Sequence, residues 1–281
     1  MSRWVWRTAV AGMSAAVLVA CVNTTQTGAV GVNRSQLLLL SSAQVDAMAV
    51  QSYREELTQA RSKNRLNTDK ANLERIRKIA DRLIPGVAAF RNDALGWQWE
   101  VNLETREELN AYCAPGGKIM FFTGIITKLK LTDDEIAAIM GHEMAHALRE
   151  HGRERMSHAY AQSAGINLIG AVTGMSQGTG QLLQTAAQVG LSLPHSRGQE
   201  TEADVLGLEL LARAGYNPNA AVTLWQKMAA ATGGSSGSFL STHPGSGQRI
   251  QSLQAAIPRV MPLYEQARRQ GVRAPAVVPR T

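Results

Sequence analysis

The chain has 281 residues, a formal net charge of +7 and a pI of about 9.7. This length is sufficient for one catalytic domain with a substantial hydrophobic core. The Lys and Arg residues are scattered, without interleaved aromatic residues or a nucleic-acid motif, which argues against binding of DNA or RNA. Attraction to anionic lipid head groups is a reasonable consequence of the charge.

The N-terminus predicts a leader and an anchor. Two arginines precede an uncharged run over residues 8–20, which is too short to span a bilayer and indicates a signal peptide over residues 1–20. The run ends Leu18-Val19-Ala20-Cys21, similar to the bacterial lipobox, in which the cysteine is acylated; a plain secretory signal is the alternative. Acyl chains on Cys21 would hold the protein to a membrane, since each buried methylene contributes about 0.8 kcal/mol. No Asp follows Cys21 directly, which resembles the signal for outer-membrane sorting.

Three segments follow this leader. Residues 21–66 are expected to form a lipid-anchored linker and an N-terminal helix, and residues 67–260 the main domain. Residues 261–281 are expected to form a basic, Pro-rich tail, which is too short for a helical repeat of about 34 residues.

Four elements precede the most informative motif. Apolar periodicity predicts helices over residues 41–61 and 68–90, the second ended by Pro85-Gly86. Alternating apolar residues predict strands over residues 97–103 and 118–126.

The segment His142-Glu143-Met144-Ala145-His146 is an HExxH motif inside a well-marked helix, which Thr132 and Glu135 begin with a capping box. Residues four apart share a helical face, so both imidazoles can point at one metal ion, with Glu143 placed to take a proton from a metal-bound water. The alternative is an exposed amphipathic helix with two surface histidines. A catalytic site also needs a third protein ligand and an open position for water.

Residues next to the motif do not supply the third ligand. Glu150 is separated from His142 by about 12 Å of helix rise, which is too far for one ion. The HExxHxxGxxH class of zinc proteases is excluded, because Arg149 and Gly152 stand where that pattern requires Gly and His. His151 faces elsewhere on the helix and is interpreted either as a support for a ligand or as a surface residue.

A second helix, predicted from Ser196 to Gly215, offers a better candidate. Glu200 and Asp204 are four residues apart near its start and share a face. Glu200 could therefore ligate the metal, while Asp204 accepts a hydrogen bond from the other nitrogen of a ligand histidine and fixes its tautomer. The alternative is an acidic first turn favoured by the helix dipole.

The HExxH motif and the downstream SRxxExxAD motif, residues 196–204, together resemble the gluzincin metallopeptidases of the CAAX-protease, HtpX and Oma type. The similarity is greatest to their periplasmic lipoprotein branch, here without its tetratricopeptide domain. A strand segment over residues 110–124 and an HPxxxxRI element beginning at His243 also match the family. The resemblance spans roughly residues 70–255.

This resemblance implies a mostly helical α+β fold, a zincin-like metallopeptidase domain with a small β-sheet whose edge strand borders the active-site helix. It implies one Zn²⁺ per chain held by His142, His146 and Glu200, with Glu143 as general base and Asp204 orienting a ligand histidine. An exposed edge strand beside the zinc would hold an extended peptide by backbone pairing. The residues expected to form this substrate strand are Lys118, Ile119, Met120 and Phe121.

Three further residues are candidates in the same resemblance. His243 could stabilise the oxyanion, or occupy the open position on the zinc and hold the enzyme latent; a loop histidine next to a helix cap is the alternative. Arg249 could orient His243 or bind a substrate carboxylate. Arg197, in the SRxxExxAD motif, is a further candidate site residue.

Two features carry open alternatives. Cys113 is interpreted as a small buried hydrophobic residue, and a disulfide with Cys21 would require the lipobox interpretation to be wrong. Residues 156–196 contain no Asp, Glu, Lys or Arg. They are expected to form two buried helices over the catalytic core rather than a membrane-facing hairpin, because Gln, Ser and Asn interrupt every candidate span.

The sequence therefore predicts a zinc-dependent endopeptidase, anchored by lipid in a bacterial outer membrane and facing the periplasm. By resemblance, its substrates are misfolded or misassembled envelope proteins, its role is quality control, and the outer-membrane assembly machinery is a further partner. Two alternatives stay open, a chaperone-like assembly factor with little or no proteolysis and a zinc-dependent cell-wall hydrolase. The intact Glu143 argues against the first, and the lack of any resemblance to a peptidoglycan-binding repeat argues against the second.

Overall fold

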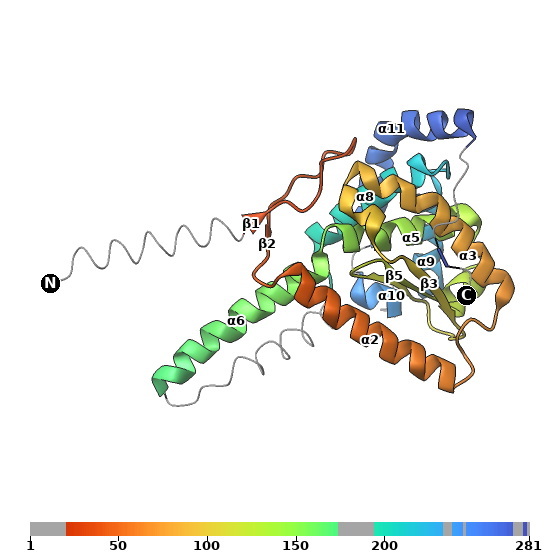
Figure 1. Cartoon of the computed structure of the whole chain (residues 1–281). Helices are drawn as coiled ribbons and strands as arrows, with labels where there is room; N and C mark the ends of the chain where they lie inside the picture. Colours follow the sequence, from red (N-terminus) through yellow and green to blue (C-terminus); the bar gives the residue numbers. More distant parts are fainter. Residues whose placement is uncertain (1–20, 174–193, 233–237, 244–245, 272–277, 280–281) are drawn as a thin grey trace.

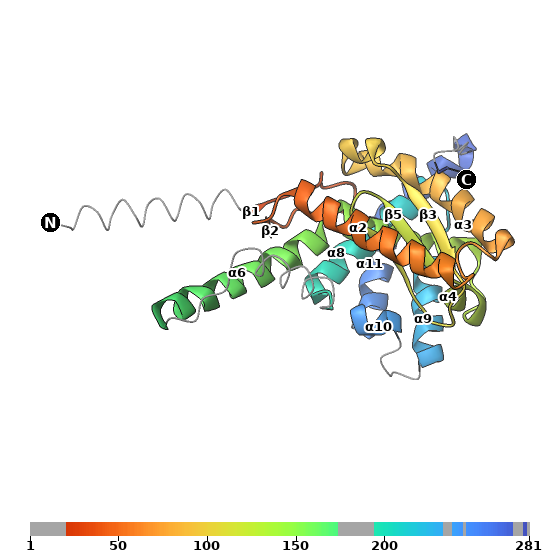
Figure 2. The same cartoon turned by 60° about the horizontal axis from the view of Figure 1, so that its bottom comes forward.

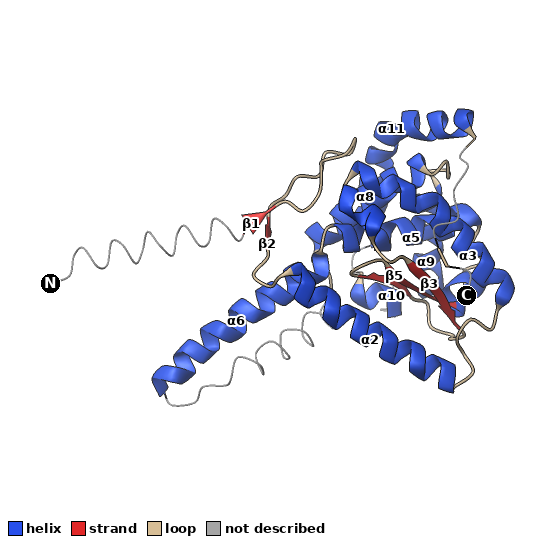
Figure 3. Cartoon of the chain, viewed as in Figure 1, coloured by secondary structure: helices blue, strands red, loops and turns tan. Residues whose placement is uncertain are grey.

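The structure is a computed structural model that describes residues 21–173, 194–232, 238–243, 246–271 and 278–279. The predicted signal peptide, residues 1–20, lies outside these ranges. The described part is mostly helical and contains a small mixed sheet (Figure 3), so the predicted α+β class is confirmed.

Helices make up most of the described chain (Figure 1). The α-helices are α2 (Ser42–Ser62), α3 (Lys70–Leu83), α4 (Thr123–Lys128), α5 (Asp133–Leu148), α6 (His151–Thr173), α8 (Arg197–Arg213), α9 (Ala220–Thr232), α10 (Ser238–Thr242) and α11 (Ser246–Gln270). Two 3₁₀ helices, η1 (Ile84–Ala89) and η2 (Asn92–Gly96), connect α3 to the sheet.

The main sheet has three strands, β3 (Glu100–Glu104), β4 (Ala111–Ala114) and β5 (Lys118–Phe122). β5 is the central strand, parallel to β3 and antiparallel to β4, and its Ile119 lies opposite Val101 and Cys113. All residues of β5 are buried and both of its edges are paired. The prediction that residues 118–121 form the exposed substrate strand is therefore wrong, because a strand with two partners has no free backbone edge. The edge strand beside α5 is β4.

The two faces of the sheet follow the period-2 alternation of β5. Ile119 and Phe121 point into the main core, to which α3, α5 and α8 contribute. Met120 and Phe122 point to the other face and pack with Tyr53 of α2. The sheet is thus enclosed between α2 on one face and the helices α3, α5 and α8 on the other (Figure 2).

Two glycines bring α5 and α8 into close contact. A Cβ atom on Gly207 would lie 2.7 Å from the backbone nitrogen of His142, and one on Gly141 would lie 2.9 Å from the carbonyl oxygen of Gly207. Real Cβ atoms do not approach other atoms this closely, so the two helix backbones meet only because both positions lack a side chain. This crossing places His142 beside Glu200 of α8.

Several element boundaries differ from the sequence prediction. The helix predicted over residues 68–90 is α-helical only to Leu83 and continues as the 3₁₀ helix η1, whose start contains Pro85. The strand predicted to end at residue 126 ends at Phe122, where α4 begins. The last helix runs from residue 246 to 270 and crosses the expected domain boundary at residue 260.

Helix α6 leaves the body of the molecule instead of covering it (green in Figure 1). Its first residues are packed, with Met156 and Ser157 buried, but His158, Ala161 and Gln162 are exposed. The expectation of two buried helices over the catalytic core is therefore wrong for the described part of this segment, and residues 174–193 lie outside the described residues. No helix among the described residues is long and apolar enough to cross a membrane.

Candidate metal centre

Four side chains from three elements converge on one point. His142 and His146 lie one turn apart on α5, Glu200 lies in the first turn of α8, and His243 follows α10 directly. The ring nitrogens of His142 and His146 are 3.1 Å apart, and both Nε2 atoms face Glu200, at 3.6 Å and 3.4 Å from its carboxylate oxygens. The Nδ1 atom of His243 lies 3.3 Å from His142 Nε2 and 3.0 Å from Glu200 Oε1.

These spacings fit a tetrahedral metal ion. Ligand atoms at about 2.1 Å from such an ion lie about 3.4 Å from one another, and the five measured separations range from 3.0 to 3.6 Å. All four residues are buried, and their ligand atoms form a group that could hold a metal. The predicted ligands His142, His146 and Glu200 are thus brought together, and His243 stands at the fourth vertex.

The start of each ligand helix follows from local sequence signals. Thr132 and Glu135 form the predicted capping box of α5, and Ser196 and Gln199 form a second one at the start of α8. The second box fixes the first turn of α8, which carries Glu200. Burial would raise the pKa of Glu200, but the hydrogen bond from His243 and the charges of His243, His142 and Arg249 outweigh it and lower the pKa to about 2. Glu200 is therefore ionised and could act as a metal ligand.

Glu143 lies beside the metal ligands and faces the same space. Burial raises the pKa of Glu143, while the charges of His243 and His142 act in the opposite direction. Its Oε1 atom is buried, has no hydrogen-bond partner among the described residues and lies 3.5 Å from His243 Nε2. A buried carboxylate oxygen left without a donor is costly, so this position is one where a water or a substrate group would be expected.

Asp204 and Arg249 hold His142 and Glu200 in position through hydrogen bonds and ion pairs. His142 Nδ1 lies 3.0 Å from Asp204 Oδ1, so the ring donates its Nδ1 proton there and leaves Nε2 free for a metal. Arg249 donates to both oxygens of Asp204, at 2.7 Å and 2.6 Å, and its Nη1 lies 2.6 Å from Glu200 Oε2. Arg249 is buried over the ring of Trp225. It therefore holds the acidic residues in place, and the carboxylates that it contacts belong to this chain.

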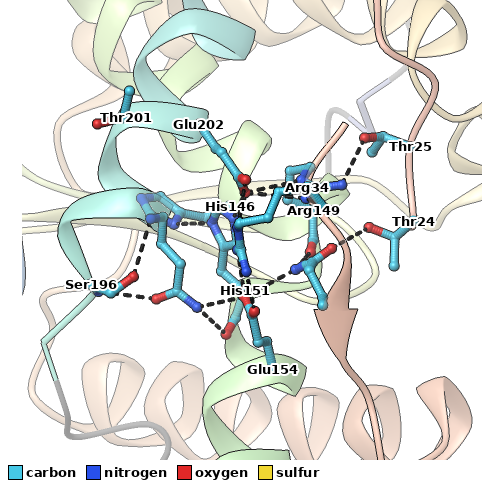
Figure 4. A network of polar contacts seen from close by, with 12 residues as sticks. Thr24, Thr25, Arg34, His146, Arg149, His151, Glu154, Ser196, Thr201 and Glu202 are labelled. Carbon is cyan, nitrogen blue, oxygen red and sulfur yellow. Dashed lines mark hydrogen bonds and ion pairs between the residues drawn. The ribbon is translucent and has the colours of Figure 1, made fainter. Parts of the chain in front are cut away.

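His146 has its own supporting group, most of which the sequence analysis missed (Figure 4). His146 Nδ1 lies 2.8 Å from His151 Nδ1, and His151 Nε2 lies 2.9 Å from Glu202 Oε2. Glu150 has a positive φ of 52°, which ends the α5 helix and turns His151 back toward His146. His151 is fully buried, so the interpretation as a surface residue is wrong, and its contact with His146 is the one that the supporting interpretation requires.

A cleft of about 330 Å³ opens onto this centre. Its walls include α2, β4, Glu143, His146 and His243. Just before β4 begins, Phe122 N donates a hydrogen bond to Asn110 O, so the backbone groups of Asn110 and of every second residue after it face β5. Because paired and unpaired positions alternate along an antiparallel strand, the backbone N–H and C=O of Cys113 point away from β5, toward the free edge. An unpaired strand edge thus lines the same cleft as Glu143.

His195 and Arg155 also line this cleft, and sequence reasoning missed both. The rings of His195 and His146 lie 3.8 Å apart between centroids, and Arg155 Nη1 lies 3.0 Å from His195 Nε2. Burial lowers the pKa of His195, and burial also lowers the pKa of Arg155 to about 10. The sequence feature that could have indicated His195 as a site residue is its position directly before the SRxxExxAD motif.

Among the described residues, neither Arg197 nor either cysteine belongs to the ligand group. Arg197 is exposed in the first turn of α8 and does not line the cleft. Cys113 is a buried free thiol in β4, as expected for a small buried residue, and burial raises its pKa. Cys21 begins the two-residue strand β1 (Cys21–Val22), which pairs with β2 (Gln36–Leu37).

Comparison with known proteins identifies the family. The profile of peptidase family M48 matches residues 70–257. The chain is 40% identical over 163 residues to the mitochondrial metalloendopeptidase OMA1 of Schizosaccharomyces pombe. This alignment covers 57% of this chain and 47% of that protein. The chain is 26% identical over 250 residues to the metalloprotease YcaL of Escherichia coli, covering 87% and 94% of the two chains. It is 28% identical over 246 residues to the metalloprotease LoiP of the same organism, covering 85% and 92%.

The chain spans about half the length, or less, of the OMA1 relatives that it matches first. The profile match nevertheless covers more than half of this chain and contains the HExxH motif, Glu200 and His243. The resemblance to HExxH metallopeptidases of the Oma type is confirmed, and the chain belongs to peptidase family M48.

Proposed function

We propose that the chain is a zinc-dependent endopeptidase that cleaves unfolded or misassembled proteins. The observation that carries this proposal is the convergence of His142, His146 and Glu200 at tetrahedral spacing. Beside them lies a buried Glu143 oxygen that has no hydrogen-bond partner in the described part of the chain. Two imidazoles and one carboxylate, with a fourth position for water, are the ligand set of a common class of zinc peptidases. A scaffold protein has no need of such a buried carboxylate.

Each residue has a defined task in this reaction. Zinc, when bound, supplies a Lewis acid that lowers the pKa of a bound water to about 7. Glu143 takes a proton from the attacking water and later delivers it to the leaving amine. Because burial raises the pKa of Glu143 above that of an ordinary glutamate, the same group can accept the proton and return it. Asp204 and His151 hold the two ligand imidazoles in the tautomer that leaves Nε2 free.

The free edge of β4 is the proposed substrate-binding strand, in place of residues 118–121. An extended peptide that pairs with the outward-facing groups of Cys113 would lie along the cleft that contains Glu143. Such pairing recognises the backbone of the substrate more than its side chains. It requires a substrate segment that has no secondary structure of its own. Unfolded and misassembled proteins provide such segments.

We further propose that His243 holds the enzyme latent. Its Nδ1 stands at the fourth vertex of the ligand group, where a catalytic water would have to bind, and lies within hydrogen-bonding distance of Glu200. Its Nε2 faces Glu143, the proposed base. In this position His243 competes with water and substrate and must move before cleavage.

A place in the bacterial envelope is proposed from the N-terminus. The leader-like residues 1–20, the lipobox-like run ending at Cys21 and the positive charge of the chain support a lipoprotein in the outer membrane. In the periplasm, a peptidase for unfolded chains would act in quality control of envelope proteins, and the outer-membrane assembly machinery is a proposed partner. YcaL and LoiP, which match most of this chain, are metalloproteases of a bacterium.

Cys21→Ser is expected to abolish the incorporation of labelled fatty acid and to move the protein from the membrane fraction to the soluble fraction of lysed cells. The reason is that a thioether-linked lipid needs the thiol of this residue. Cys113→Ser, which changes a buried thiol elsewhere in the chain, should keep the label. A membrane-bound, labelled Cys21→Ser protein would refute the anchor.

The function itself is tested by incubating the purified protein with an unfolded model protein and following the fragments by mass spectrometry. Cleavage is expected with bound zinc, is expected to stop after chelation, and is expected to return when zinc is added back. A zinc-loaded protein that leaves the substrate intact, even after His243 is replaced, would favour the chaperone-like alternative.

Glu200→Ala is expected to weaken zinc binding by more than about 100-fold. Removal of a residue that only hydrogen-bonds a metal ligand costs at most about this much. The physical reason is that the only carboxylate among the ligand atoms is lost. Zinc affinity is measured by competition with a chromophoric chelator. Glu265→Ala removes an exposed carboxylate on α11 and should leave the affinity unchanged. A Glu200→Ala protein with wild-type affinity would move the third ligand elsewhere.

A further inference from the structure

The residues after Cys21 do not form the linker that was expected. Residues 23–40, here called the strap, run along the junction of α5 and α6 (Figure 4). β2 of the strap pairs with β1 and packs against the start of α6. The buried residues of the strap are Thr25, Val30, Gln36, Leu38 and Leu40.

Arg34 of the strap joins two buried carboxylates. Its Nε donates to Glu202 Oε1 at 2.7 Å and its Nη2 to Glu202 Oε2 at 3.2 Å. Its Nη1 and Nη2 donate to the two oxygens of Glu154, at 2.5 Å and 2.9 Å. The guanidinium thus makes a two-bond fork with each carboxylate, a geometry that fixes the orientation of both groups.

The strap also supplies partners to Arg149, which is fully buried at the end of α5. Arg149 donates to the carbonyl oxygen of Arg34 at 2.8 Å and to the side chain of Asn23 at 2.5 Å. Gln36 donates to the carbonyl oxygen of Arg149 at 2.6 Å. Arg149 and Arg34 together balance the charges of Glu154 and Glu202, so the buried cluster is complete only when the strap is docked.

Glu202 connects this cluster to the metal ligand. Its oxygens accept hydrogen bonds from the guanidinium groups of Arg34 and Arg149, so Glu202 is an acceptor. His151 therefore donates its Nε2 proton to Glu202, which leaves Nδ1 as an acceptor for the Nδ1 proton of His146. In this tautomer, His146 presents the lone pair of Nε2 to the ligand group.

We propose that Arg34 is a positioning residue of the metal centre, which acts on the ligand His146 through Glu202 and His151. Among the described contacts, the donor to Glu202 Oε1 is Arg34, whereas Oε2 accepts from Arg149 and His151 as well as from Arg34. Without Arg34, the carboxylate of Glu202 loses the fork that sets its plane, and His151 loses a fixed acceptor. The inference rests on the proposed zinc site and extends it to the strap, which begins two residues after Cys21.

The test compares zinc affinity in three variants of the full chain. Arg34→Met is expected to weaken zinc binding about tenfold or more, in the range found when partners of metal ligands are removed. Arg34→Lys is expected to recover only part of this loss, since an ammonium group supplies charge without the planar fork. Arg259→Met is the matched control, because this exposed arginine also donates to the strap, at the carbonyl oxygen of Ala29, and touches neither Glu202 nor Glu154.

A second readout separates positioning from stability. In ¹⁵N spectra of the imidazoles, the wild type is expected to show His151 with its proton on Nε2, and Arg34→Met is expected to show a mixture of tautomers. A folded Arg34→Met protein with wild-type zinc affinity and a single His151 tautomer would overturn the proposal and leave the strap a purely structural element. Arg34→Lys serves the same purpose if Arg34→Met does not fold.

The two proposals fail in different ways. A wild-type protein that binds zinc but cleaves nothing refutes the peptidase function and leaves the affinity comparison intact. Equal zinc affinities in the wild type and the Arg34 variants refute the positioning role and leave the peptidase function intact. A wild-type protein that binds no zinc refutes both.

Discussion

Glu143→Gln is expected to keep the metal and to lower peptide cleavage by about 10²–10⁴-fold, the range contributed by a positioned general base. Gln has nearly the shape of Glu but cannot accept the proton of the attacking water. Glu143 is not among the four residues whose ligand atoms converge at tetrahedral spacing, so the zinc content of the variant should equal that of the wild type. The measurement is the initial rate of cleavage of an unfolded model protein, together with zinc content by atomic emission.

The control for this variant is Glu265→Gln, which makes the same chemical change on an exposed face of α11 and should retain full activity. A chelated wild type sets the background rate. Retained cleavage by zinc-loaded Glu143→Gln would refute the assignment of the base. Loss of zinc by this variant would instead mean that Glu143 helps to hold the metal.

The parts of this site that repeat at helical spacing could be predicted from the sequence. His142 and His146, and likewise Glu200 and Asp204, are four residues apart, and each pair shares a face of one helix. The capping box at Thr132 and the second helix from Ser196 to Gly215 were predicted within two residues of their observed bounds. Each of these patterns lies within a single helix, so it can be recognised from the sequence without knowing how the helices pack.

The parts that depend on the packing of distant segments could not be predicted. The order of strands in the sheet is one case, because the pairing of β3 with β5 joins two segments that β4 separates in the sequence. The turn at Glu150 is another: a non-glycine residue with positive φ has no clear sequence signal, and without it His151 would not face His146. The docking of Arg34 spans a separation of more than 100 residues.

The last helix shows how a local pattern can mislead. Pro258 and Pro262 argue against a continuous helix, yet α11 contains both. Packing against α8 and α9 covers this stretch, and Leu253, Ala256 and Val260 are buried. Tertiary burial outweighs the loss of a backbone donor at each proline.

His243→Ala is expected to raise the activity on unfolded substrate by about tenfold or more. If the open state is a minor population of at most about 10%, the apparent affinity for substrate is reduced by that fraction, and removing the competing imidazole restores it. The gain should appear as a lower KM with little change in kcat, because the ligands His142, His146 and Glu200 and the base Glu143 are untouched. Zinc content should stay at one ion per chain.

Of the two roles considered for His243, the geometry favours the latent one. An oxyanion-stabilising histidine would aim a donor at the substrate, and its loss would lower kcat by about 10²–10³-fold. Here Nδ1 lies 3.0 Å from Glu200 and 3.3 Å from the Nε2 of His142, so the imidazole is directed at the ligand group itself. His158→Ala, which removes an exposed imidazole on α6, should leave both kinetic constants unchanged. A fall in kcat of His243→Ala at unchanged zinc content would assign the residue to the transition state instead, and the latency would then have to come from another part of the cleft.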